Sequence, residues 1–166
     1  RSLAACARSP GGARAAPAAA GAASISARGD WYIDFLQIEQ ADGAVDSYGK
    51  GHGGEVLPVW RQNDTGNFRL AVEPGRGDAE SWRRSSEQAA RLDNGETLVK
   101  VEQLNCQVGH LGARLTFTTS TGRTIVIEGQ YGTKKVKHHE EHEVDVGQQV
   151  KELVFEDSRL ADVVAD

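Results

Sequence analysis

The stretch Arg114-Leu115-Thr116-Phe117-Thr118 decides the fold class, because polar and apolar side chains alternate along its whole length. Successive side chains of a β-strand point to opposite faces of the sheet, so the stretch predicts a strand with Leu115 and Phe117 facing the core. Thr121-Gly122 follows as a turn, and residues 124–128 form a second β-branched run. This part of the chain therefore predicts two strands joined by a tight turn.

Runs of the same kind recur through the rest of the chain. They cover residues 24–28, then the turn Gly29-Asp30, then residues 31–39, 97–104, 134–140, 143–146 and 150–155. Strands at this spacing, separated by glycine-containing turns, predict an all-β sandwich, barrel or prism. Residues 61–91 interrupt the pattern, and we expect an inserted loop there, with a short helix capped by Asp78.

The first 29 residues differ in composition from the rest of the chain. They contain four arginines and no acidic residue, whereas the remainder contains 15 basic and 24 acidic residues. An arginine-rich, serine-containing, acid-free segment is typical of organelle transit peptides. We therefore expect a leader or linker over residues 1–23 and a single domain over residues 24–166. The same composition predicts import into a plastid or mitochondrion, with secretion as the alternative.

Composition argues against several function classes. The net charge of −5 does not favour nucleic acid or an anionic membrane as a partner, and no apolar run is long enough to span a bilayer. The two cysteines, Cys6 and Cys106, are too few for a disulfide framework or a four-ligand zinc site. No nucleophile and base stand in a recognisable arrangement. We expect no catalytic residues, no cofactor and no enzymatic activity.

Two motifs resemble signatures of other binding functions, one of dinucleotide binding and one of metal binding. Gly49-Lys50-Gly51-His52-Gly53-Gly54 matches a dinucleotide fingerprint, but that fingerprint must open a helix, and a strand-like run with Pro58 follows it instead. His138-His139-Glu140-Glu141-His142 would place His138, Glu140 and His142 on one face of a strand, as metal ligands can be placed. A charged sheet edge is the commoner use of such a run, and we expect no metal site.

Several runs, taken in order, resemble the jacalin-related lectins, particularly their animal secretory-granule branch. These runs are Trp31-Tyr32-Ile33-Asp34-Phe35-Leu36-Gln37-Ile38, Gly51-His52-Gly53-Gly54-Glu55, Leu92-Asp93-Asn94-Gly95-Glu96-Thr97-Leu98-Val99, Arg114-Leu115-Thr116-Phe117-Thr118-Thr119-Ser120-Thr121-Gly122-Arg123 and residues 150–162. The resemblance implies a β-prism of three four-stranded Greek-key sheets. It also implies a sugar site at one end, made by a glycine-rich loop and a G-x-x-x-D motif in the last loop.

The residues that this resemblance assigns to the sugar site are Gly53, Gly54, Ser158, Arg159, Leu160 and Asp162. A glycine lets its backbone amide approach a sugar because it has no Cβ. Asp162 matches the family aspartate, whose carboxylate accepts hydrogen bonds from sugar hydroxyls. Ser158 stands where the family has glycine, and a serine is strained there if the position needs a positive φ.

The expected function is metal-independent recognition of mannose- or galactose-type glycans by a lectin-like domain. The alternative is a non-catalytic structural or accessory subunit of a larger organelle complex, which contacts other protein subunits through residues 61–91. Both remain open at this point, because a fold does not fix a function.

Overall fold

The fold is all-β, as the alternating sequence predicts. The computed structural model describes residues 21–50, 54–73, 89–106 and 111–166, and these contain thirteen strands and no helix. Every pairing between two of these strands is antiparallel. No helix in the described ranges has the length and apolar character needed to cross a membrane.

The strands form three sheets. The first sheet contains, in spatial order, β3 (Val45–Gly49), β2 (Ile33–Gln40), β1 (Ala22–Gly29) and β4 (Glu55–Val56), with β7 (Ala90–Arg91) also paired to β1. The second contains β11 (His138–Glu143), β8 (Leu98–Asn105), β9 (Arg114–Thr119), β10 (Thr124–Glu128), β5 (Val59–Gln62) and β6 (Phe68–Val72). The third is the hairpin of β12 (Val150–Glu156) and β13 (Arg159–Ala165). The described sheets therefore hold five, six and two strands, where the resemblance implied four in each.

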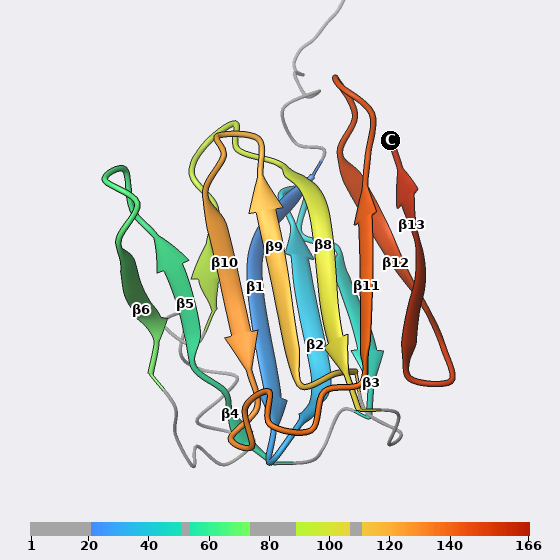
Figure 1. The fold of residues 1–166 in the computed structure, drawn as a ribbon. Helices are drawn as coiled ribbons and strands as arrows, with labels where there is room; N and C mark the ends of the chain where they lie inside the picture. Colours follow the sequence, from blue (N-terminus) through green and yellow to red (C-terminus); the bar gives the residue numbers. More distant parts are fainter. Residues whose placement is uncertain (1–20, 51–53, 74–88, 107–110) are drawn as a thin grey trace, which may run out of the picture.

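The first and second sheets lie face to face, and the β12–β13 hairpin runs along one side of them beside β11 (Figure 1). The core fills the space between the sheets: Ile25 and Leu36 from the first and Leu115 and Phe117 from the second are fully buried. Burying one such side chain contributes about 1.5–3 kcal/mol. Alternation in β9 thus directs Leu115 and Phe117 inward, as predicted.

The terminal hairpin shares this core. Leu153 from β12 and Leu160 from β13 are buried in it. Tyr48 in β3 accepts a hydrogen bond at its hydroxyl from the Leu153 amide at 3.1 Å, and burial raises the pKa of Tyr48. The hairpin is therefore packed as part of the domain.

Several predicted strands are confirmed by the pairing. β1 and β2 form the expected hairpin, with Ile25 opposite Ile38, and β9 pairs with β10, with Phe117 opposite Ile125. β8 and β12 lie within a residue of their expected ranges. The strand expected over residues 143–146 is wrong beyond Glu143, because the chain turns at residues 145–148. The strand expected over residues 134–140 begins only at His138, after a turn.

The expected loop at residues 61–91 is wrong in its first part. β5 and β6 form a hairpin there that extends the second sheet beyond β10. Its loop is held by Asn63, whose Oδ1 accepts hydrogen bonds from the amides of Thr65 and Asn67 at 3.0 Å each. An Asn side chain that bonds the backbone two residues ahead is a turn signal, and it allows the chain to reverse here. The helix expected from Asp78 lies outside the described residues.

The amino-terminal boundary differs slightly from the expectation. β1 begins at Ala22, two residues before the expected start of the domain, and it is the central strand of the first sheet. Residues 1–20 of the expected leader lie outside the described residues.

Candidate functional site

The turn between β12 and β13 adopts an unusual backbone conformation. Its two residues, Asp157 and Ser158, have φ values of 49° and 70°. Two consecutive positive φ values define the type I′ turn, whose twist matches that of a hairpin. Ser158 therefore occupies the left-handed region that glycine adopts freely, and a residue with a Cβ loses about 1–2 kcal/mol there.

Two buried amide side chains from β8 hold this turn in place. The carbonyl oxygen of Ser158 accepts hydrogen bonds from Gln103 Nε2 at 2.9 Å and from Asn105 Nδ2 at 2.6 Å. Gln103 also accepts from the Leu160 amide at 2.8 Å and donates to the Leu111 carbonyl at 2.7 Å. Gln103 is fully buried and Asn105 nearly so, so these bonds satisfy polar groups that are largely removed from solvent.

A polar groove of about 310 Å³ opens beside the turn. It is lined by Asn105, His138, Glu156, Asp157 and Arg159, which come from β8, β11, β12, the turn and β13. The lining combines a guanidinium and an amide, which donate hydrogen bonds, with two carboxylates, which accept them. This mixture suits a ligand with many hydroxyl groups.

Arg159 is the predicted site residue whose side chain lines the groove. Its guanidinium lies 3.4 Å from Glu140 and 3.8 Å from Glu156, and its side chain is about half exposed. Exposed ion pairs of this kind contribute only about 0–1 kcal/mol to the free energy of folding. The guanidinium can therefore leave these glutamates and bind a ligand oxygen with little loss of stability.

The other predicted residues of the terminal segment have different positions. Ser158 contributes its carbonyl to the amide side chains of β8, and Leu160 is fully buried in the core. Asp162 lies on β13 with 72% of its side chain exposed, 3.9 Å from His142 Nδ1, and its Oδ1 accepts a hydrogen bond from the Val163 amide. Asp162 is not among the residues that line the groove.

Gly54 lies elsewhere. It precedes β4 with a φ of 76°, and a Cβ at this position would come within 2.2 Å of the Gly29 carbonyl oxygen. Its own carbonyl accepts a hydrogen bond from Arg28 at 3.0 Å. Figure 1 shows β4 beside the β1–β2 turn and the β12–β13 turn on the right of the same end of the molecule, and Gly54 is not among the residues that line the groove. Gly53 lies outside the described residues.

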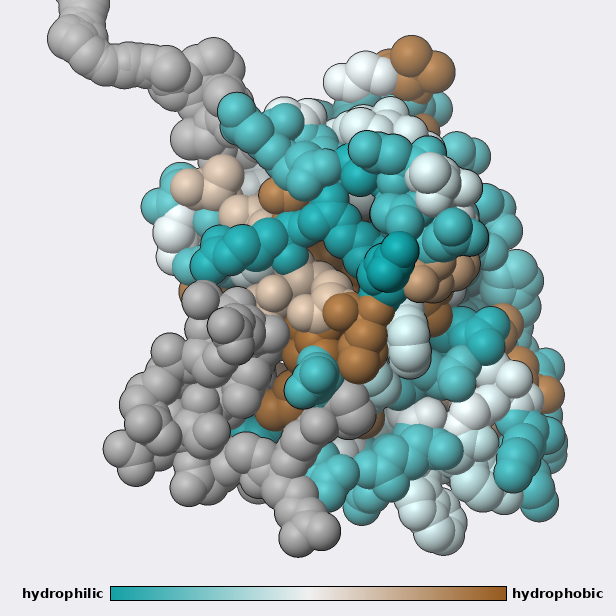
Figure 2. Space-filling model, turned by 90° about the vertical axis from the view of Figure 1, so that its left-hand side faces the viewer, coloured by the Kyte–Doolittle hydropathy of each residue, from teal (hydrophilic) through white to brown (hydrophobic). Residues whose placement is uncertain are grey.

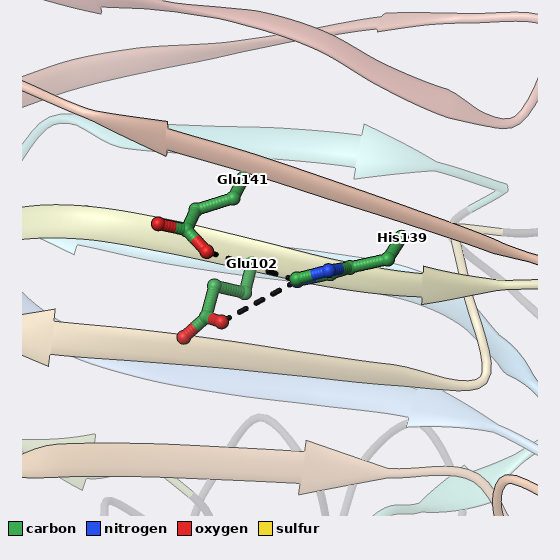
Figure 3. Close-up of side chains that lie close together, drawn as sticks. All are labelled: Glu102, His139 and Glu141. Carbon is green, nitrogen blue, oxygen red and sulfur yellow. Dashed lines mark ion pairs between the residues drawn. The ribbon is translucent and has the colours of Figure 1, made fainter.

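The histidine-rich strand β11 has two polar faces. As predicted, His138, Glu140 and His142 share one of them, where His138 lines the groove and Glu140 and His142 contact β13. A group that could hold a metal ion lies on the other face: His139 and Glu141 meet Glu102 of β8 (Figure 3).

The geometry of that second group is that of a small ion-pair cluster. His139 Nε2 lies 3.4 Å from Glu102 and 3.9 Å from Glu141, and the three ligand atoms are all within 4.8 Å of one another. Lys100 lies 3.1 Å from the Glu141 carboxylate, and this contact raises the pKa of Lys100. The lysine thus balances part of the negative charge of the pair of glutamates.

A buried carboxylate, Glu96, lies just before β8, at the end of the second sheet away from the groove. Glu96 has a side chain only 1% exposed, and it accepts hydrogen bonds from Thr119 at 2.7 Å and Thr121 at 2.6 Å. Arg61 lies 3.1 Å from the same carboxylate. Burial acts to raise the pKa of Glu96, but the hydrogen bonds outweigh it and lower the pKa below its ordinary value. Glu96 therefore stabilises the fold by holding Arg61 and two threonines together.

Comparison with known proteins assigns no family. No protein-family model, no curated protein and no solved structure matches this chain. The class that the structure defines is an all-β domain of packed antiparallel sheets.

Proposed function

We propose that the protein is a non-catalytic carbohydrate-binding domain of β-prism type that recognises a mannose- or galactose-type glycan without a metal ion. The observation that carries this proposal is the polar groove at the β12–β13 turn, in the segment where the resemblance to jacalin-related lectins places a sugar site. Of the residues that the resemblance assigns, Arg159 is the principal ligand-binding side chain in this proposal.

The chemistry of the groove supports the proposal. A sugar presents hydroxyl groups that both donate and accept hydrogen bonds. Glu156 and Asp157 can accept such bonds, Arg159 can donate two from a planar fork, and Asn105 holds the turn beside them through the Ser158 carbonyl. The type I′ turn and the amide side chains of β8 hold these groups in place before a ligand arrives, which reduces the entropy lost on binding.

A glycan array probed with the full chain, followed by calorimetry on the glycans it selects, tests the proposal. We expect weak, saturable binding to mannose- or galactose-type glycans that is unchanged when EDTA is added. Absence of binding to any glycan would reject the carbohydrate-binding function, and binding abolished by EDTA would reject metal-independent recognition.

One observation favours a second candidate function, a structural or accessory subunit of a larger complex. The β5–β6 hairpin, which begins at Val59 and extends into residues 61–91, ends the second sheet at β6, and it exposes Phe68 and Leu70 beside Trp60 of β5. Figure 2, which views the molecule from this side, shows apolar side chains gathered near the middle of the face. An exposed apolar edge strand is a common site of pairing with another chain.

Affinity purification of the tagged chain tests this second function. We expect a protein partner to be retained by the native chain and lost from the Leu70→Lys variant, because a charge on β6 disfavours edge pairing. Retention of the same partner by both chains, or monomeric behaviour of the native chain with no partner, would count against it.

A further inference from the structure

A pair of stacked aromatic rings lies at the end of the molecule that carries the groove. Trp31, in the turn between β1 and β2, stacks on Tyr131 with ring centroids 5.4 Å apart and an interplanar angle of 16°. Tyr32 meets Tyr131 edge-on, with centroids 5.8 Å apart. Trp31 is nonetheless 61% exposed, so much of the indole faces solvent.

The two loops that carry these rings are held together by their backbones. The Tyr131 amide donates to the Trp31 carbonyl at 3.0 Å, and the Gln130 amide donates to the Asp30 carbonyl at 2.9 Å. Gly129 packs so closely that a Cβ there would lie 2.3 Å from the Trp31 carbonyl oxygen. The indole is thus presented on a fixed support, and a ligand that stacks on it orders little additional backbone.

The surroundings of the indole are polar. Gln130 Nε2 donates to Glu55 at 2.9 Å; Gln130 and Asp30 are exposed, and Glu55 is half-buried. A flat apolar ring face bordered by an amide and carboxylates matches a pyranose ring, which has an apolar C–H face and hydroxyl groups around its rim. A protein partner would instead favour a wider apolar surface.

Tyr32, which contacts Tyr131, connects the aromatic pair to the strand that ends beside the groove. Tyr32 shares a hydrogen bond with the thiol of Cys106, and Cys106 follows Asn105, which lines the groove. Figure 1 shows the β1–β2 turn and the β12–β13 turn at the same end of the molecule. The aromatic pair and the groove therefore lie at the same end of the molecule.

We propose that Trp31 and Tyr131 form a second sugar subsite, where the indole stacks on one pyranose ring of an oligosaccharide whose other end occupies the groove. This inference rests on the proposed carbohydrate-binding function and narrows the ligand to an oligosaccharide. Two linked contacts bind more tightly than either alone, because the second is made at high effective concentration.

Calorimetry with a monosaccharide and with an oligosaccharide of the same sugar tests the inference. We expect Trp31→Ala to weaken oligosaccharide binding about tenfold and to leave monosaccharide binding within about twofold. Trp60→Ala is the matched control, since Trp60 is also exposed but lies on the outer part of the second sheet, and it should change neither. Thermal unfolding of both variants checks that each remains folded.

A fluorescence measurement provides a second readout. The chain has three tryptophans, so replacing Trp60 and Trp82 by phenylalanine leaves Trp31 as the single tryptophan. Its emission should shift on addition of the oligosaccharide. If the native chain binds the oligosaccharide and Trp31→Ala binds it equally well, the second subsite is rejected and the carbohydrate-binding function stands. If the native chain binds no sugar of either length, both proposals fail.

Discussion

Asn105 donates a hydrogen bond to the carbonyl oxygen of Ser158 at 2.6 Å, and the same side chain lines the groove. One residue of β8 therefore both holds the terminal turn and forms part of the proposed sugar site. The shape of the groove depends on this contact, because Asp157 and Arg159 stand on either side of Ser158.

Replacement of Asn105 by alanine tests this dual role. The Ser158 carbonyl would keep only Gln103 as a partner, so we expect Asn105→Ala to lower the free energy of unfolding by about 1–2 kcal/mol. Sugar affinity should fall as well, because the turn loses an anchor. Urea denaturation and calorimetry measure the two effects, and unchanged stability would show that the contact does not hold the turn.

Ser158→Gly should stabilise the protein. Glycine relieves the strain of the positive φ at residue 158, but its greater freedom in the unfolded chain offsets part of this gain. We expect the free energy of unfolding to rise by about 0.5–1 kcal/mol. Ser47→Gly, in an exposed position of β3 that has no positive φ, is the control and should destabilise instead. Urea midpoints compare the two, and a fall in stability for Ser158→Gly would contradict the strained turn.

The stability of Gly54→Ala, measured by urea denaturation, tests the structural role of this glycine. Its Cβ would meet the Gly29 carbonyl oxygen at 2.2 Å, so we expect a loss well above 1 kcal/mol, the scale of an incompatible φ alone. Gly43→Ala is the control, because Gly43 has a similar positive φ and open space around it. Equal stability of the two variants would show that close packing on β1 does not require Gly54.

Glu96→Gln should cost about 2–4 kcal/mol near neutral pH, because it removes a buried charge paired with Arg61 and hydrogen-bonded to two threonines. The folded-state pKa of Glu96 lies below its ordinary value of 4.5, so its ionised form stabilises the fold above that pH and the contribution is lost as pH falls. Thermal unfolding between about pH 7 and about pH 3 should show a smaller acid loss in Glu96→Gln than in the native chain.

An exposed glutamate provides the comparison for that experiment. Glu152 is exposed on β12, and Glu152→Gln should change stability by no more than about 0.5 kcal/mol at either pH. If Glu96→Gln behaved like Glu152→Gln, the buried carboxylate would have no structural role.

Local patterns in the sequence predicted the hairpins well. Alternation around Phe117 and the turns at Gly29 and Gly122 specify strands whose partners are adjacent in the chain. The sequence pattern does not predict the β5–β6 hairpin, because its turn signal, the Asn63 side chain that bonds the backbone, lies among other polar residues that favour a loop. The split of the strands into sheets of unequal size depends on long-range packing, which no local pattern reveals.

The candidate site was less predictable than the fold. The resemblance predicts a site within residues 158–162, and Arg159 does line the groove. Asn105 and His138 belong to strands far away in the sequence, so their convergence on the turn depends on how β8, β11 and the terminal hairpin pack. Trp31 and Tyr131 meet for the same reason, through two loops about a hundred residues apart.

Titration of a selected mannose- or galactose-type glycan into the native chain, Arg159→Ala and Arg114→Ala tests the sugar site at the groove most directly. Arg114 is the matched control, because it also forms an ion pair, with Glu128, and lines a different pocket together with Trp60 and Val126. We predict that Arg159→Ala weakens binding about tenfold or more, and that Arg114→Ala binds like the native chain. Equal binding by the native chain and Arg159→Ala would contradict a sugar site at the groove.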